Sequence, residues 1–125
     1  MEVRWQSTQA DLEDINRVLS DVYRRGEPFE SRELDPDEIG AIVRVQGEPV
    51  GTFLVMNMQT TRRTATLRGA GVAAVAIMPE QRHHGYGTQM MTWSLPAMRE
   101  RGYDVACLYA YRETYYRRFG YEVAG

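Results

Sequence analysis

The residues best suited to chemistry lie in one stretch near the middle of the chain, residues 71–91. Val72 to Met78 is an unbroken run of small and β-branched residues, which is typical of a strand buried on both faces. Pro79 follows, and because proline lacks a backbone donor it ends the strand. A polar turn with two glycines then leads into a helical pattern. The free N–H groups and the dipole at such a helix start favour binding of a phosphate group.

The glycine spacing in this turn narrows the kind of phosphate site. Residues 82–87 fit the pattern R-x-x-G-x-G. A dinucleotide-binding fingerprint needs a third glycine three residues after the second, but residue 90 is methionine. A P-loop needs a lysine, and all 15 basic side chains of this protein are arginines. A nucleotide-binding domain is therefore disfavoured. The pair His83 and His84 has no cysteine or carboxylate cluster beside it, so no metal site is expected.

A second concentration of chemically capable side chains lies near the C-terminus. Residues 111–118 contain three tyrosines and three arginines, more than a hydrophobic core requires. The pattern predicts a short helix around Glu113 to Phe119, ended by Gly120. Amphipathic tyrosines packed by their rings would be the ordinary interpretation of this stretch.

Length and composition indicate one domain of 125 residues, enough to bury roughly two-thirds of the unfolded surface. A formal net charge of −2 gives no reason to expect nucleic acid as a partner. No apolar run approaches the roughly 20 residues that span a bilayer, so no membrane partner is expected. A single cysteine excludes an internal disulfide and favours a reducing, cytoplasmic location.

The elements that must position these residues follow from hydrophobic periodicity and turn signals. Thr8, with Asp11 three residues later, predicts a capping box at the start of a helix. Its apolar face includes Tyr23, near the expected end of the helix. Strands are expected at residues 2–6, 41–45, 50–58, 72–78 and 104–109, with helices to about residue 23, from 86 to about 101, and around 113–119.

Three connecting segments complete this outline. Gln46 to Pro49 is expected to form the turn of an antiparallel hairpin. Thr60 to Arg68 should continue the second hairpin strand into an exposed turn. Arg24 to Glu38 carries six acids against three arginines, and is interpreted as a solvated loop or as a substrate-facing loop that favours a cationic amine.

With these motifs in place, the chain resembles the GNAT superfamily of N-acetyltransferases, and within it the enhanced intracellular survival (Eis) type. The strand-and-turn of residues 71–87 matches the acetyl-CoA pyrophosphate loop of that superfamily. The sequence from Leu108 to Glu122, with its Tyr-Arg-Arg-Phe-Gly-Tyr ending, carries the most specific likeness. The resemblance is good from about residue 40 onward.

The resemblance implies an α/β fold with a mixed, splayed central sheet and helices on both faces. Acetyl-CoA, the co-substrate, would lie in the splay between the strands at 72–78 and 104–109. Main-chain atoms of the first strand would pair with the pantetheine arm, and backbone amides of the turn would hold the pyrophosphate. The cofactor-binding residues expected from the family are Val75, Ala76, Ile77, His83, His84, Gly85, Tyr86, Gly87, Thr88, Tyr111 and Arg112.

Tyr116 matches the family's proton donor to the departing thiolate, and is the expected catalytic residue. A tyrosine with a pKa of about 10 can protonate a thiolate whose conjugate acid has a pKa of about 8.5. The implied reaction transfers an acetyl group from acetyl-CoA to a primary amine of a small molecule or peptide, by direct attack in a ternary complex. The alternative is a non-catalytic CoA-binding or assembly module built on the same fold.

The chain also departs from the Eis type. Relatives of this type are longer, and their general base is a chain-terminal carboxylate from a distant region, so the base of this protein is not identified. The last strand of the GNAT sheet is expected to be absent, since Gly125 follows soon after Tyr121. Residues 1–125 are thus interpreted as a single GNAT domain, which is either the N-terminal part of a longer protein, a trimmed homologue or an extracted domain. An exposed sheet edge at its end would favour a homo-oligomer.

Overall fold

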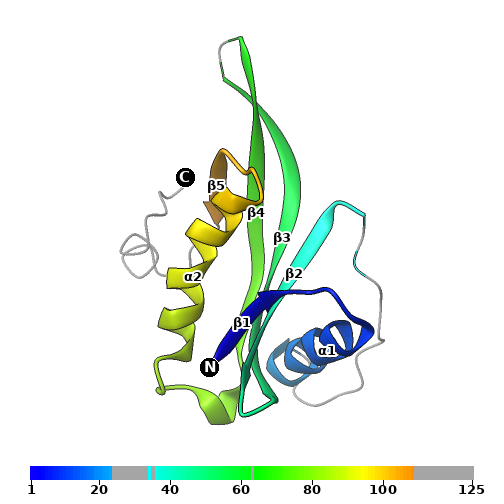
Figure 1. Ribbon diagram of the computed structural model, residues 1–125, viewed down its shortest axis with the longest axis vertical. Helices are drawn as coiled ribbons and strands as arrows, with labels where there is room; N and C mark the ends of the chain where they lie inside the picture. The colour runs from blue at the N-terminus through cyan, green and yellow to red at the C-terminus, as the bar shows by residue number, and fades with distance from the viewer. Residues whose placement is uncertain (24–33, 35, 63, 109–125) are drawn as a thin grey trace.

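The computed structural model describes residues 1–23, 34, 36–62 and 64–108 (Figure 1). The elements in order are β1 (Glu2–Trp5), α1 (Gln9–Tyr23), β2 (Glu38–Val45), β3 (Glu48–Arg62), β4 (Ala65–Ile77), the 3₁₀ turn η1 (Pro79–Gln81), α2 (Tyr86–Glu100) and β5 (Val105–Leu108). The strands form one sheet in the order β1-β2-β3-β4-β5. β1 to β4 are antiparallel neighbours, and β5 joins β4 in parallel. The expected mixed sheet is confirmed, with α1 and α2 on opposite sides of it (Figure 1).

The capping box at the start of α1 is confirmed. The main-chain N–H of Asp11 donates to the Thr8 hydroxyl over 3.1 Å, and the N–H of Thr8 donates back to the Asp11 carboxylate over 3.3 Å. This reciprocal pair satisfies two donors that the first helical turn leaves without partners. The helix runs from there to Tyr23, where the apolar periodicity also ends.

Asp11 does more than cap the helix, because it is buried and forms ion pairs with two arginines from the sheet. Its Oδ1 atom lies 2.7 Å from Arg4 on β1 and 2.8 Å from Arg44 on β2. Burial acts to raise the pKa of Asp11, but the hydrogen bonds from Ser7, Arg44 and Arg4 outweigh it and hold that pKa well below its usual range. The network fixes the start of α1 against the edge of the sheet.

The hairpin of β2 and β3 turns more tightly than the sequence indicates. Its turn consists of Gln46 and Gly47, both in the left-handed region with φ of 52° and 80°, and Glu48 and Pro49 already belong to β3. Positive φ at both central residues matches the right-handed twist of the flanking strands. The expected four-residue turn was therefore two residues too long.

β3 and β4 form a hairpin much longer than expected. β3 extends to Arg62 and β4 begins at Ala65, so most of the predicted exposed turn at 60–68 is paired strand. β4 was also expected to be buried on both faces between Val72 and Met78, and this holds in part, because Ala76 is buried against α1 while Val75 and Ile77 pack against the core beneath α2. Val72 is buried, but Ala73 is exposed on the other face.

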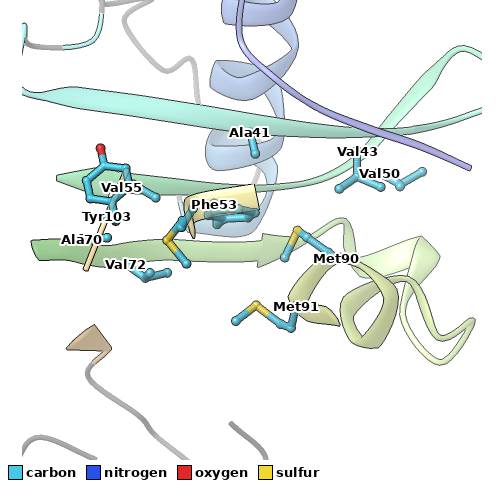
Figure 2. Close-up of a cluster of buried hydrophobic side chains, with 11 residues drawn as sticks. Ala41, Val43, Val50, Phe53, Val55, Ala70, Val72, Met90, Met91 and Tyr103 are labelled. Atoms are coloured by element: carbon cyan, nitrogen blue, oxygen red, sulfur yellow. The ribbon is translucent and has the colours of Figure 1, made fainter. Parts of the chain in front are cut away.

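One face of the sheet packs against α2 in a core built around Phe53 and Met91 (Figure 2). Trp5, Phe53 and Trp93 meet there with ring centroids 5.1–6.1 Å apart, which joins β1 and β3 to the middle of α2. These contacts hold α2, and therefore the turn that precedes it, at a defined place on the sheet. The buried members of this cluster are Ala41, Val43, Val50, Phe53, Val55, Ala70, Val72, Met90, Met91, Met98 and Tyr103.

The other face packs against α1. Ile15 and Leu19 of the helix meet Ile42, Leu54 and Ala76 of three neighbouring strands in a second buried cluster. The two helices thus cover opposite faces, and β4 contributes side chains to both cores. This double role explains the small and β-branched residues of the strand.

α2 ends as the sequence predicts. Gly102 follows it with φ of 89°, a conformation that favours glycine at a helix end. Two hydrogen bonds between Asp104 and Arg68 lead the chain into β5. The main-chain N–H of Asp104 donates to the carbonyl of Arg68, and the main-chain N–H of Arg68 donates to the carboxylate of Asp104. No helix in the part of the chain that the structure describes is long and apolar enough to cross a membrane.

Candidate functional site

The middle of β4 carries a β-bulge that sequence reasoning did not predict. Thr52 pairs with Ala76, and Leu54 pairs with Ala73, so Phe53 alone faces both Ala74 and Val75. Ala74 has φ of 53°, a left-handed conformation that costs an alanine about 1–2 kcal/mol. Such bulges bend the strand and redirect its main-chain groups, and they recur next to active sites.

The bulge lies where β4 loses its neighbour on the other edge. β5 pairs with β4 only from Gly69 to Val72. Beyond Val72, none of the described residues pairs with that edge of the strand. The main-chain N–H of Met78 donates to the carbonyl of Val50 over 2.8 Å, in register with the pair of Thr52 and Ala76. Antiparallel strands alternate their bonding direction, so the main-chain groups of Val75 and Ile77 are directed away from β3.

Because of this alternation, the three residues of β4 that were expected to contact the cofactor do not all direct their main-chain groups to the same side of the strand. Val75 and Ile77 offer main-chain donors and acceptors at the edge beyond β5. Ala76 directs its main-chain groups toward Thr52, and its side chain is buried under α1. A second peptide-like chain laid along this edge would therefore bond to every other residue.

Tyr23, the last residue of α1, contacts this edge. Its hydroxyl donates a hydrogen bond of 3.1 Å to the main-chain carbonyl of Val75. The side chain is 57% exposed, although the periodicity of the helix placed it on the apolar face. The position of Tyr23 beside the bulge could not be inferred from sequence, because the two residues are 52 positions apart.

The turn after β4 has the form expected of an anion site. η1 begins at Pro79, and the chain then passes through His83 and Gly85, with φ of 70° and 80°. Gly85 is the N-cap of α2 and has no side chain to bond the first N–H groups of the helix. These donors are thus available to a ligand at the positive end of the helix dipole.

The side chains of this turn leave its backbone accessible. Arg82, His83, His84 and Gly85 are exposed, and a Cβ atom built on Gly85 would meet nothing within 4 Å. The ring of His84 stacks on Tyr86, with centroids 5.6 Å apart. The exposed guanidinium of Arg82 adds a permanent positive charge beside the turn. A diphosphate fits this arrangement, since it needs several N–H donors and nearby positive charge.

The predicted residues of the turn, His83 to Thr88, therefore lie together at the start of α2, next to the end of the bulged strand. Tyr111, Arg112 and Tyr116 lie outside the described residues, as does the helix expected around 113–119. The expected absence of a last strand, and the free edge near Tyr121, also lie outside them. The described residues contain no group of three or more His, Cys, Asp or Glu side chains that could hold a metal ion.

The fold and this strand-and-turn site define an acetyltransferase domain. A family model described as an acetyltransferase (GNAT) domain matches residues 4–124, and the chain belongs to this family. No curated protein matches the chain.

Solved structures support the same fold. Eis1 from Mycobacterium abscessus shares 30% identity at a TM-score of 0.73, over 98% of this chain and 31% of that one. A ribosomal-protein-alanine N-acetyltransferase from Brucella melitensis biovar Abortus 2308 shares 16% identity at a TM-score of 0.78, over 100% and 95% of the two chains. A probable N-acyltransferase from Enterococcus faecalis V583 shares 16% identity at a TM-score of 0.80, over 98% and 33%. The chain thus spans about a third of the Mycobacterium and Enterococcus proteins.

Proposed function

We propose that this domain transfers an acetyl group from acetyl-CoA to a primary amine of a small molecule or peptide. The observation that carries the proposal is the bulged edge of β4, which runs directly into an open, left-handed turn at the start of α2. Coenzyme A has an amide-containing arm and a diphosphate. The strand edge suits the arm, and the anion site that follows it along the chain suits the diphosphate.

The pantetheine arm would lie along β4 beyond Val72. Its amides are peptide-like, so they can bond to the main-chain groups of Val75 and Ile77 as an added strand would. Ala76 lies between these two residues, and its pairing with Thr52 on β3 holds the strand in place. The arm would then lead the diphosphate to the turn at His83 to Thr88, where main-chain N–H groups and Arg82 compensate its charge.

Acetyl transfer then needs only the amine and two proton transfers. The amine nitrogen attacks the thioester carbonyl carbon, a C–N bond forms, the C–S bond breaks, and the electron pair leaves on sulfur. The nitrogen loses one proton, and the thiolate gains one. We assign the second transfer to Tyr116, with Tyr111 and Arg112 beside the cofactor, on the match of residues 108–122 to the Eis type.

We infer further that the domain is of the Eis type and acts in the cytoplasm. The likeness to Eis1 at 30% identity supports the first inference, together with the Tyr-Arg-Arg-Phe-Gly-Tyr sequence. A single cysteine among 125 residues supports the second.

Steady-state release of free thiol tests the proposal. Acetyl-CoA is mixed with the protein and a panel of primary amines, and amine-dependent thiol release above the amine-free rate is expected. Varying both substrates should give intersecting double-reciprocal lines, because direct attack requires both to be bound together. Parallel lines would indicate an acetylated enzyme and contradict direct attack. Binding of CoA without amine-dependent release would favour the non-catalytic CoA-binding module.

A further inference from the structure

Two ring side chains on either side of the N-cap of α2 stack on each other. The ring of His84 lies nearly parallel to that of Tyr86, with an interplanar angle of 21° and centroids 5.6 Å apart. Gly85 stands between them with φ of 80°, and this left-handed turn brings both side chains to the same side of the chain. The turn lies at the end of the molecule opposite the tip of the β3–β4 hairpin (Figure 1). We call His84 and Tyr86 the ring pair.

The ring pair is anchored on one side and open on the other. Tyr86 is half-buried and packs against the core beneath α2. His84 is exposed, and among the described residues its ring makes no hydrogen bond and no second ring contact. Tyr86 covers one face of the imidazole, so the opposite face is in solvent. The pair therefore holds a flat, exposed ring face in a defined orientation, which suits the stacking of a planar ligand group.

This ring face adjoins the site proposed for the diphosphate. The first N–H groups of α2, which lack partners within the helix, follow directly after His84 and Gly85. In coenzyme A, a ribose joins the diphosphate to adenine, so the base must lie within one sugar of the diphosphate. A diphosphate bound at the turn thus brings the adenine within reach of the ring pair. Bases stack readily on tyrosine and histidine rings.

A second surface near the start of α2 is less suited to the base. A groove of about 450 Å³ lies between the N-terminal residues and α2, and Gln89 and Trp93 are among the residues that line it. Its one aromatic ring, Trp93, already contacts Trp5 and Phe53. The groove also lies beside β1, at the opposite edge of the sheet from the edge of β4 proposed for the pantetheine arm.

We propose that the ring pair stacks the adenine of CoA, so that the domain takes its acetyl group from free acetyl-CoA and not from the phosphopantetheine of a carrier protein, which has no adenosine. This inference rests on the proposed acetyl transfer, which makes acetyl-CoA the ligand. The imidazole of His84 contacts the base, and Tyr86 holds that imidazole in place. The main chain of the turn binds the diphosphate, as proposed above.

Variants of His84 test the stack through the binding of CoA. His84→Ala removes the ring, and calorimetric titration should show CoA binding weakened about five- to thirtyfold, the lower part of the range for a base on an aromatic side chain. His84→Phe keeps a flat ring without the imidazole nitrogens, so it should bind CoA within about twofold of the parent. Gln89→Ala is the control, because Gln89 is exposed in the first turn of α2 and lines the other groove. It should leave the affinity unchanged, and thermal melting of each variant confirms that it is folded.

A CoA analogue with the fluorescent base ethenoadenine reports the stack independently of affinity. Each protein is saturated with the analogue, and collisional quenching of the base by acrylamide is measured. Quenching in the parent should be about half that of the free analogue, because a ring covers one of the two faces of the base. In His84→Ala it should approach the value of the free analogue, and in His84→Phe it should stay low.

The choice of acetyl donor tests the predicted selectivity. kcat/KM for thiol release is compared between acetyl-CoA and S-acetyl-4′-phosphopantetheine, and the parent should prefer acetyl-CoA. His84→Ala should reduce this preference by the same factor of about five to thirty, by lowering kcat/KM for acetyl-CoA alone.

The outcomes distinguish this inference from the proposed function. Unchanged CoA affinity and shielding in His84→Ala would overturn the inference, as would a loss that His84→Phe does not restore, since the histidine would then act through its nitrogens. A loss in Gln89→Ala with none in His84→Ala would place the base in the groove beside β1 and would also overturn it. The expected affinities and shielding without amine-dependent thiol release would support the stack and contradict acetyl transfer. No binding of CoA by the parent would contradict both.

Discussion

The hydroxyl of Tyr23 lies 3.1 Å from the main-chain carbonyl of Val75, and this hydrogen bond joins the last residue of α1 to the bulge of β4. The contact links the end of α1 to the strand edge proposed for the pantetheine arm. It also occupies an acceptor that an amide of the arm would use.

Tyr23→Phe should therefore bind CoA as tightly as the parent, or up to about fivefold more tightly. The variant removes a competing donor, and an exposed hydrogen bond is worth about 1 kcal/mol, which corresponds to about a fivefold change in affinity. Calorimetric titration with CoA measures the change. Clearly weaker binding in Tyr23→Phe would mean that the hydroxyl assists the cofactor instead of competing with it.

Gly85→Val should abolish the stabilisation that CoA confers. A ligand that binds only the folded state stabilises it by about 2.7 kcal/mol at one hundred times its Kd, which raises the melting temperature. The position is exposed and a Cβ there meets nothing within 4 Å, so a side chain would occupy the space needed by the diphosphate.

Gly47→Val is a matched control for this experiment. Gly47 also has φ of 80° and also has nothing within 4 Å of a built Cβ, but it lies in the β2–β3 turn. Both variants should lose similar stability from backbone strain, while only Gly85→Val should lose the CoA-induced shift. Equal shifts in the two variants would remove the turn at Gly85 from the cofactor site.

Asp11→Asn should reduce the free energy of unfolding by about 1–3 kcal/mol, because it removes the buried carboxylate that pairs with Arg4 and Arg44. Arg44 keeps its pair with Asp14, whose Oδ2 lies 2.7 Å away. Urea denaturation at pH 7 measures the loss. Glu2→Gln is the control, since Glu2 is exposed and lies 3.6–3.9 Å from the same arginines. Exposed ion pairs contribute about 0–1 kcal/mol, so this control should change little.

The lowered pKa of Asp11 also predicts acid lability. The folded carboxyl stays ionised at a pH where the unfolded one, with a pKa of about 3.9, already binds a proton. The unfolded state therefore binds more protons, and stability should fall as the pH drops below about 4. Unfolding free energies measured from pH 7 to pH 2 should show this fall in the parent and a smaller one in Asp11→Asn. Parallel curves for the two proteins would contradict the assignment.

Tyr116→Phe should lower kcat by about 10²–10⁴ while changing KM and CoA affinity little, because the lost hydroxyl acts in the transition state. Tyr115→Phe should be nearly silent. Thiol release by both variants, with any amine that the parent accepts, provides the comparison. A near-parental kcat in Tyr116→Phe would show that the thiolate departs without this proton donor.

Local sequence determined much of this protein. Thr8 and Asp11 satisfy each other's main-chain donors within a single turn, so their spacing alone predicted where α1 begins. Pro79 and Gly85 likewise mark the end of β4 and the start of α2, since one lacks a donor and the other adopts a left-handed conformation. The resemblance to acetyltransferases came in part from the same stretch, and its most specific part from residues 108–122.

Only the tertiary structure decided where β4 bulges and where Tyr23 lies, because residues close in sequence do not specify either feature. Nothing in Ala73-Ala74-Val75 signals a bulge, because alanine disfavours a positive φ, and the extra residue exists only relative to Phe53 on β3. Tyr23 matches an apolar helical period, yet its exposure and its bond to Val75 depend on where α1 ends over the sheet. Hydrophobic spacing predicts which face of an element is buried. Where that burial stops depends on the register between strands and on how far each helix extends over the sheet.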